Sequence, residues 1–283
     1  MAEARSARMD HVVGGLAWGA ALAIAACFTW IIWDMIVQGI GLIDFDFLTR
    51  EPRDAGRAGG IGTILVSTGL IVGVCLVVAV PLGIATAAWL SELAPGAGRA
   101  SRAVRTSLDL LASVPSIVFG LFGMVFFCQV LGMGFSILAG GMTLACMVLP
   151  LVVRTTYAGL RGAPDDLRLG GAALGLTRTA TLRHLLLPAA FHGAVIGIIL
   201  ALGRAMSETA ALIFTSGYVT RMPESLLDSG RSLSVHIYDL AMNVAGGESN
   251  AHATALALLV LLLLINLSAS RLAAVWLEAR QRS

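Results

Sequence analysis

The chain has 283 residues, of which 57% are hydrophobic and 13% charged, with a formal net charge of +2. This balance excludes an ordinary soluble domain, and so small a net charge gives no reason to expect a nucleic-acid partner. A membrane-spanning helix needs about 20 mostly apolar residues. Apolar runs of that length occur at 12–37, 61–91, 108–133, 134–155, 189–216 and 251–276. The sequence therefore predicts an all-α, polytopic membrane protein with six transmembrane helices.

The positions of the basic residues predict how the chain is oriented, because cytoplasmic loops are enriched in Arg and Lys. All 19 basic residues are arginines. With the N-terminus inside, Arg204 lies within a span, and the arginines left on the outer face are Arg50, Arg53, Arg57, Arg221 and Arg231. The other arginines then face the cytoplasm. We expect both termini there, in a bacterial cytoplasmic membrane.

Residues 1–58 are predicted to form an N-terminal arm, the first span and an outer loop, ahead of a main domain at 59–283. The first apolar run has features of a cleavable secretory signal, but it continues through Trp33 and exceeds a signal core. We favour a retained span. All four cysteines lie in apolar runs without metal-ligand spacing, so we expect neither a disulfide framework nor a metal site.

The third apolar run contains Ser113-Val114-Pro115-Ser116. A proline with serines nearby loosens backbone hydrogen bonds and bends a helix. Such a bend lines a pathway in some membrane proteins and is a plain structural kink in others, which makes Ser113 and Ser116 candidate pathway residues. Asp109 is expected to be solvated at the start of this span.

The segment 162–188 is a polar insert between two apolar runs. Pro164 followed by Asp165 and Asp166 predicts a helix start, because acidic residues suit the positive end of the helix dipole. Gly175 is a plausible helix stop. Gly170 and Gly171 cost helix stability, so they indicate either close approach or an irregular helix. A short helix held outside the lipid is expected to contact another protein.

The fifth apolar run carries Arg204, Ser207, Glu208 and Thr209. A charge at the bilayer centre costs about 2.5–3.5 kcal/mol on insertion scales. The i, i+4 spacing places Arg204 and Glu208 on one helix face. Two interpretations follow, a self-neutralising structural pair and a polar face on a substrate path, and we favour the second.

Two further features concern the rest of the chain. The outer loop 217–250 is too apolar between Leu233 and Met242 for a simple linker, and His236 lacks a partner at metal-ligand spacing, so we expect it to be structural. The chain contains no lysine, whereas a P-loop needs Gly-Lys-Ser/Thr. We therefore expect the chain not to be an enzyme and to bind no cofactor of its own.

Several stretches resemble a known family. Gly175, Leu187 and Pro188 match the cytoplasmic loop motif E-A-A-x3-G-x9-I-x-L-P of bacterial ABC-importer permeases, although Leu169 stands at the glutamate. Gly170 and Gly171 replace the alanines, and Leu185 replaces the isoleucine. The stretches 59–69, 113–123, 203–214 and 232–243 resemble the phosphate-importer permeases of the PstA type.

The resemblance implies a MetI-like ABC-importer permease fold and a chain that moves inorganic phosphate. It also implies a second permease (PstC type), an ATPase dimer that binds ATP–Mg (PstB type) and a periplasmic phosphate-binding protein (PstS type). Residues matching the family's substrate pathway or its ATPase-coupling segment are candidates for these roles. The pathway candidates are Arg204, Glu208, Ser207, Thr209, Ser113 and Ser116; the coupling candidates are Asp165, Asp166, Arg168, Gly170, Gly171, Gly175, Leu187 and Pro188.

Alternative functions remain open at this point. The chain could be a permease for another oxyanion, such as sulfate or molybdate. A membrane assembly or sensory protein without a transport path is a second alternative, and it predicts that Arg204 and Glu208 are dispensable for uptake. A membrane enzyme is the least favoured class, because the sequence has no legible nucleophile–base pair or metal cluster.

Overall fold

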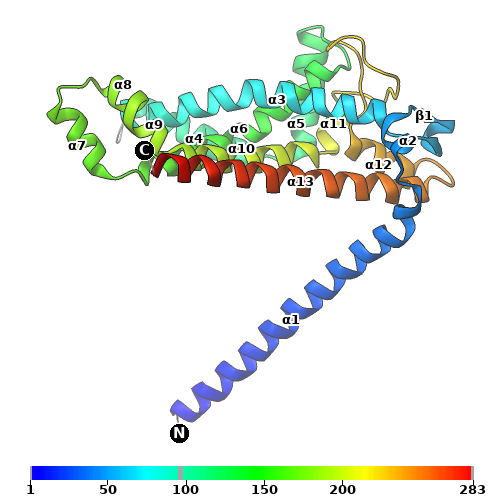
Figure 1. The fold of residues 1–283 in the computed structure, drawn as a ribbon, viewed down its shortest axis with the longest axis horizontal. Coiled ribbons are helices and arrows are strands. Elements are labelled where there is room, and N and C mark those ends of the chain that lie inside the picture. Colours follow the sequence, from blue (N-terminus) through cyan, green and yellow to red (C-terminus); the bar gives the residue numbers. More distant parts are fainter. Residues whose placement is uncertain (1, 95–97, 282–283) are drawn as a thin grey trace.

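The computed structural model describes residues 2–94 and 98–281 as a bundle of helices with a two-stranded ribbon at one end (Figure 1). Strand β1 (Pro52–Arg53) pairs antiparallel with β2 (Ala58–Gly59). The α-helices are α1 (Ala2–Gly39), α2 (Phe45–Thr49), α3 (Gly62–Ala88), α4 (Arg99–Ser113), α5 (Ser116–Gly123), α6 (Ile137–Arg161), α7 (Asp165–Ala173), α8 (Arg178–Thr181), α9 (Leu187–Ala189), α10 (Phe191–Met206), α11 (Ala210–Ile213), α12 (Leu233–Met242) and α13 (Glu248–Gln281). The predicted all-α fold class is confirmed.

Three helices continue as π-helical turns, and two short 3-10 helices flank α2. The π-helical turns are Trp89–Leu93 after α3, Met124–Val130 after α5 and Leu182–Leu186 after α8. The 3-10 helices are Ile40–Leu42 and Asp54–Gly56. Helices α7 and α8 lie at one end of the bundle, and β1, α2 and α12 lie at the other (Figure 1).

Within the described residues, four helical segments are long and apolar enough to cross a membrane singly: Val13–Leu42, Gly62–Leu93, Ile137–Arg161 and Glu248–Arg271. Two bent pairs bring the number to six if each pair is one span. The first pair joins Arg99–Ser113 to Ser116–Val130 with a bend of 104°, and the second joins Arg178–Ala189 to Phe191–Met206 with a bend of 65°. The chain is a multi-pass membrane protein.

The two bends have different standings against the sequence-based spans. The bend expected at Ser113-Val114-Pro115-Ser116 is confirmed, because α4 ends at Ser113 and a new helix follows Pro115. Proline has no backbone N–H to donate, and it disfavours helical backbone in the residue before it; Val114 is extended accordingly. Helix α4 already begins at Arg99, so Asp109 lies inside it and not at a helix start. A continuous helix over 189–216 is wrong, since α10 ends at Met206.

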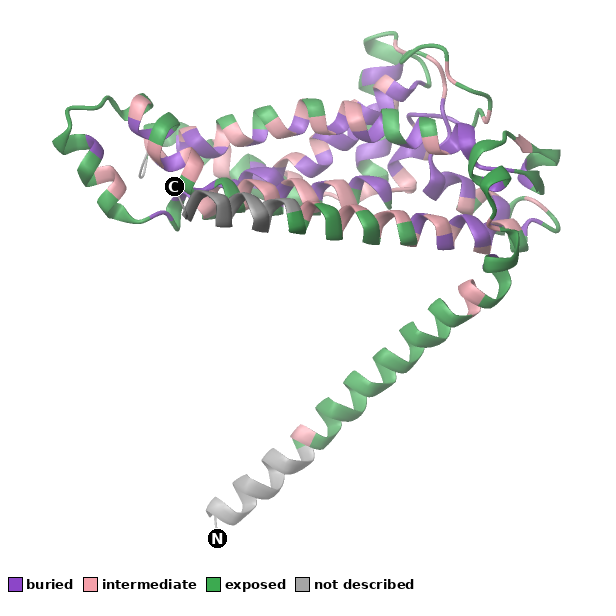
Figure 2. Cartoon of the chain, in the orientation of Figure 1, coloured by how far each residue is buried: buried purple, intermediate pink, exposed green. Residues whose placement is uncertain are grey.

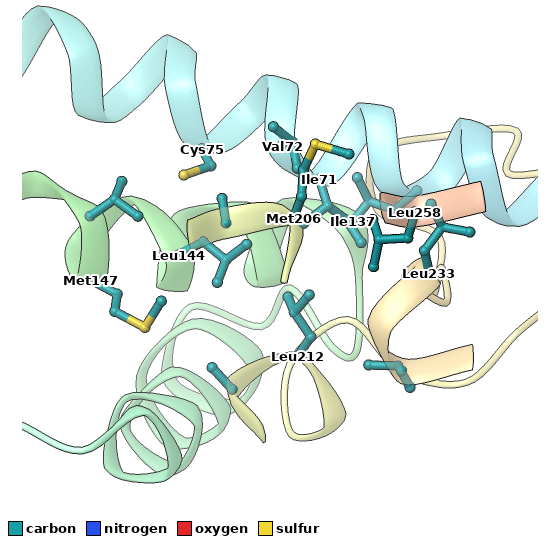
Figure 3. Close-up of a cluster of buried hydrophobic side chains, with 14 of the residues drawn as sticks. Ile71, Val72, Cys75, Ile137, Leu144, Met147, Met206, Leu212, Leu233 and Leu258 are labelled. Carbon is teal, nitrogen blue, oxygen red and sulfur yellow. The ribbon is translucent and has the colours of Figure 1, made fainter. Parts of the chain in front are cut away.

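Helix α6 is the centre of the bundle and packs against α3 and α10. Figure 3 shows side chains of α3 and α6 meeting in the buried cluster, including Ile71, Cys75 and Leu144. Glycine brings these helices close: a Cβ at Gly141 would lie 2.6 Å from Val74 Cβ. Small residues allow close packing of helices in membranes, where burial of apolar surface gives little net drive. Gly69 and Gly73 of α3, which form a G-x-x-x-G pair, instead face open space within this chain.

Helix α1 projects away from the bundle and meets it at the C-terminal end of α1, where it packs against the start of α13 (Figures 1 and 2). From Val13 to Leu42 its surface is largely exposed, and large apolar side chains such as Leu16 and Trp18 point outward. The first apolar run is thus a helix of the length and composition that lipid requires.

The end of the bundle that carries α12 is held together by a buried polar cluster. Arg231 donates to Asp239 Oδ2 at 2.8 Å and to the Tyr218 carbonyl at 3.0 Å. Its Nη1 lies 3.3 Å from Nδ1 of His236, which is almost completely buried. Burial, and then the positive charge of Arg231, lower the pKa of His236 to about 4. The apolar part of the 217–250 loop is therefore a packed helix, and His236 is a structural residue as predicted.

Candidate functional site

The guanidinium of Arg204 lies near the end of α10, immediately before a break in the helix. Helix α10 ends at Met206, and the Ser207 hydroxyl donates to the Gly203 and Arg204 carbonyls at 3.0 and 3.2 Å. A serine that bonds back to the preceding turn satisfies carbonyls that a helix end leaves without partners. Ser207 therefore takes part in the end of α10 and does not continue a polar stripe on its surface.

Glu208 lies beyond the end of α10, and its hydrogen-bond partners do not include Arg204, the partner that the sequence predicted. Its Oε1 accepts a hydrogen bond from Ala211 N at 3.3 Å, at the start of α11, and its carbonyl accepts from the Ser234 hydroxyl at 2.5 Å. No ion pair joins Arg204 to Glu208, although both residues are described. The expected sharing of one helix face is wrong, because the i, i+4 geometry requires a helix that continues past Met206.

Arg204 instead shares a cavity with a second arginine. The cavity, of about 190 Å³, lies between α4, α5, α6 and α10, with Arg154 of α6 and Arg204 of α10 among its lining residues. Phe119, Met147 and Pro150 contribute apolar walls. Two guanidinium groups in a partly apolar cavity form a site suited to an anion, because planar guanidinium groups donate paired hydrogen bonds to oxyanions.

The two arginines differ in their partners. Arg154 Nη2 donates to Asp109 Oδ1 of α4 at 2.6 Å. Arg204 makes no ion pair with any described acidic residue. The charge of Arg154 is therefore balanced by Asp109, and the charge of Arg204 is available to an anion.

Sequence reasoning missed Arg154 and Asp109 as site residues. They come from helices that are far apart in the sequence, and Arg154 looked like an ordinary inner-face arginine. A possible signal was Pro150, four residues before Arg154, because a proline inside a span bends the helix toward its neighbours.

The remaining pathway candidates, Ser113, Ser116 and Thr209, are not among the residues that line the cavity. Ser113 donates to the Leu110 carbonyl at 2.8 Å, and Ser116 is the first residue of α5, so the two serines flank the 104° bend. Thr209 precedes α11, and its carbonyl accepts from Ile213 N at 3.1 Å. Their observed contacts are with the backbone at helix ends.

The segment 162–188 contains the helix that the sequence predicted. Helix α7 begins at Asp165 with Asp166 in its first turn, directly after Pro164. Its end is followed by Gly175, which has a φ of +70° and thus the left-handed backbone typical of a glycine stop. Leu187 and Pro188 lie in α9, where the segment joins α10. The predicted start and stop are confirmed.

Arg168 ties α7 to the body of the chain. Its guanidinium donates to Glu92 at the end of the α3 span, to Asp165, and to the carbonyls of Leu160 and Ala163. The hydrogen bond with Glu92 is the main reason that the pKa of Arg168 is raised. The exposed surface of this segment includes Leu169 and Leu174, with 68% and 78% of their surface accessible, and also Asp165 and Asp166. Large apolar side chains exposed in this way suit contact with another protein.

The two adjacent glycines of α7 have different surroundings. A Cβ at Gly171 would lie 2.7 Å from Thr181 Oγ1 of α8, whereas one at Gly170 would meet nothing within 4 Å. Close approach therefore explains Gly171 and does not explain Gly170.

Among the described residues, no group of three or more His, Cys, Asp or Glu side chains could hold a metal ion.

Comparison with known families decides the class. Residues 79–283 match the family described as binding-protein-dependent transport system inner membrane component. The chain is an ABC-importer permease. The family implies that this permease works with an ATPase and a substrate-binding protein.

Relatives of known name agree with this class. The permease is 31% identical to the probable ABC transporter permease protein YqgI of Bacillus subtilis, over 95% of this chain and 94% of that protein. It is 37% identical to the phosphate transport system permease protein PstA 1 of Mycobacterium tuberculosis, over 67% of this chain and 63% of that protein. The corresponding PstA protein of Xylella fastidiosa is 35% identical, over 64% of this chain and 63% of that protein.

Solved structures support the fold of the permease. A chain of the inward-facing MetNI methionine ABC transporter superimposes with a TM-score of 0.58 at 19% identity, covering 76% of this chain and 94% of that one. A chain of a bacterial ABC transporter involved in import of the acidic polysaccharide alginate gives a TM-score of 0.59 at 18% identity, covering 89% and 95%. The expected MetI-like fold is confirmed.

Proposed function

We propose that the chain is the PstA-type permease of an ATP-driven importer of inorganic phosphate. Its partners are then a PstC-type second permease, a PstB-type ATPase dimer that binds ATP–Mg, and a PstS-type phosphate-binding protein. The observation that carries the proposal is the cavity lined by both Arg154 and Arg204. Relatives named as phosphate permeases support the same substrate.

The arrangement suits phosphate in three respects. Arginine stays charged and can donate two parallel hydrogen bonds to a tetrahedral oxyanion. Asp109 neutralises Arg154, so the cavity offers one uncompensated guanidinium, that of Arg204. A site with limited excess charge holds an anion weakly, and transport requires that the anion can leave as well as enter.

The polar segment gives the ATPase a place to act. In this proposal α7 faces the cytoplasm and presents Leu169 and Leu174 to the ATPase, with Asp165, Asp166 and Gly170 beside them. Cysteines placed at 169 or 174 and on the ATPase should crosslink in native membranes. Labelling of residue 174 by an impermeant reagent from the periplasm would contradict this topology, including the cytoplasmic location of both termini.

Uptake of radiolabelled phosphate tests the site. Arg204→Ala should abolish uptake at normal membrane abundance, and Arg204→Lys should restore little of it, because lysine keeps the charge and loses the planar fork. Arg221→Ala is the matched control, since Arg221 is an exposed arginine that does not line the cavity. Wild-type uptake in Arg204→Ala would remove the pathway assignment. Absence of phosphate uptake by the wild-type importer would instead favour a non-transporting assembly or sensory role.

The cavity chemistry also fits sulfate or molybdate, which are oxyanions of similar shape. Competition separates these substrates: unlabelled phosphate in excess should block uptake by the reconstituted importer, and unlabelled sulfate or molybdate should not. Uptake of labelled sulfate or molybdate that phosphate does not suppress would favour the alternative importer.

A further inference from the structure

Glu92 and Arg168 join two parts of the chain that are far apart in the sequence. Arg168 lies on α7, and Glu92 lies in the π-helical turn that ends the α3 span. Arg168 Nη2 donates to Glu92 Oε1 at 2.9 Å, and Arg168 Nε donates to Glu92 Oε2 at 3.3 Å. This forked pair is more shielded than the other α7 pair, because the side chains of Arg168 and Glu92 are 24% and 12% exposed.

The carboxylate of Glu92 is also held by a neighbouring side chain. Ser91, which is buried, donates its hydroxyl hydrogen to Glu92 Oε1 at 2.7 Å. A side chain held by a neighbouring hydrogen bond loses little further freedom when it forms an ion pair, so the geometry of the pair is reproducible.

The other contacts of Arg168 lie at the end of α6 and at the start of its own segment. Nη2 donates to the Leu160 carbonyl at 2.8 Å, and Nη1 donates to the Ala163 carbonyl and to Asp165 Oδ1 at 3.1 and 3.0 Å. These bonds fold the start of α7 onto the end of α6. Of the hydrogen bonds that the Arg168 side chain makes, those to Glu92 reach the end of the α3 span.

Glu92 and Arg168 lie at a cavity beside an apolar cluster. The cavity, of about 350 Å³, lies between α7, α8 and the ends of the α3 and α6 spans, and both residues line it. Leu167 of α7 packs against a buried cluster that includes Ala87 and Leu90 at the end of the α3 span. Close packing transmits displacement between helices. The forked pair adds a directional polar connection to this apolar contact.

We propose that Glu92 and Arg168 are positioning residues that transmit displacement of α7 to α3 and so link ATP hydrolysis to opening of the transport path. This inference rests on the proposed function, in which an ATPase acts on α7. Helix α3 packs against α6, which carries Arg154, so movement of α3 reaches the wall of the arginine cavity.

The experiment uses the complete importer in proteoliposomes and measures phosphate transported per ATP hydrolysed. Glu92→Gln keeps the shape of the side chain and removes its charge, and it leaves every Arg168 contact within 160–165 in place. We expect this ratio to fall by about five- to tenfold, the lower part of the range for coupling between two sites, at normal abundance and complex assembly.

Asp46→Asn is the matched control. It makes the same kind of charge-removing change in another arginine–carboxylate pair, Arg50–Asp46, which is exposed and lies outside the polar segment. We expect a ratio close to that of the wild type. The double variant Glu92→Arg with Arg168→Glu should recover part of the ratio, which a purely local structural role would not predict. If Glu92→Gln does not assemble, Glu92→Asp is measured by the same criteria, since its shorter carboxylate still carries the charge but cannot reach both nitrogens.

An unchanged ratio in Glu92→Gln, or an equal fall in Asp46→Asn, would overturn the inference. Failure of the proposed function gives a different result, because the wild-type importer would then not transport phosphate at all. In that event we measure, in place of the transport ratio, the fraction of ATP hydrolysis that depends on the binding protein. The same variants are compared by this fraction, and the comparison tests whether Glu92 and Arg168 link the ATPase to the permease.

Discussion

Gly171 of α7 lies directly against Thr181 of α8, and a methyl group at Gly171 would stand 2.7 Å from the Thr181 hydroxyl oxygen. The two helices flank Gly175, so this contact sets how the polar segment folds back on itself. The contact between α7 and α8 therefore accounts for a glycine at position 171, and the helix propensity of α7 does not.

Leucine at Gly171 should separate α7 from α8. Overpacking of this kind costs about 1–3 kcal/mol locally. In a permease whose α7 contacts an ATPase, Gly171→Leu should lower uptake severely while the protein remains in the membrane. The measurement is uptake together with abundance by immunoblot.

Gly170→Leu provides the control, because a Cβ there meets nothing within 4 Å. It adds the same side chain to the same helix. If the two variants lose uptake equally, the close contact with Thr181 does not matter and surface change on α7 explains both.

Acid should loosen the α12 end of the bundle through His236. Its folded pKa of about 4 lies below the ordinary value of 6.5, so between these pH values the unfolded chain binds more protons than the folded one. Stability from this group is present above pH 6.5 and is lost as the pH falls. At pH 5 the loss is about 2 kcal/mol, at 1.36 kcal/mol per pH unit.

Thermal unfolding of purified protein in detergent at pH 7.5 and pH 5 checks this expectation. Because other groups titrate in the same range, the informative quantity is the difference between the wild type and His236→Asn. The variant should start less stable and show a shallower loss on acidification. Identical pH slopes would exclude His236 as the cause.

The Arg231–Asp239 pair should contribute more to stability than exposed ion pairs do. Its side chains are mostly buried, and removal of one partner leaves the other charge without compensation. Asp239→Asn should therefore destabilise the protein by about 3 kcal/mol. Asp46→Asn removes one partner of the exposed Arg50–Asp46 pair and should have little effect. Equal melting temperatures for the two variants would contradict the assignment.

Local signals in the sequence predicted local structure well. The proline and two aspartates before α7, and the glycine after it, act within one helical turn, and the structure has the helix between them. The apolar runs likewise identified the helices that lipid requires, because hydropathy is summed over adjacent residues.

The site was less predictable because it depends on where helices stop and which helices meet. Spacing alone placed Arg204 and Glu208 on one helix face, but α10 ends between them. The relation of Arg204 to Arg154 depends on packing of α10 against α6, and that of Arg168 to Glu92 joins residues 76 apart. No local pattern contains such pairings.

The break after α10 makes a specific prediction for Glu208. Its Oε1 accepts from Ala211 N, and the amide oxygen of glutamine can accept the same bond. Glu208→Gln should therefore be folded and abundant, because no Arg204–Glu208 ion pair is lost. Glu208→Ala removes the acceptor at the start of α11 and should lower stability by about 1 kcal/mol, as loss of a helix cap does.

Uptake by these variants then separates structure from transport. If the negative charge of Glu208 serves the passage of phosphate, Glu208→Gln should transport poorly at normal abundance, and Glu208→Asp should retain more activity than Glu208→Gln. If Glu208 serves only the start of α11, Glu208→Gln should transport like the wild type and Glu208→Ala should show the larger defect. We expect the first pattern, because a carboxylate in an apolar stretch is costly, and a neutral glutamine would supply the same hydrogen bond to Ala211 at a lower cost.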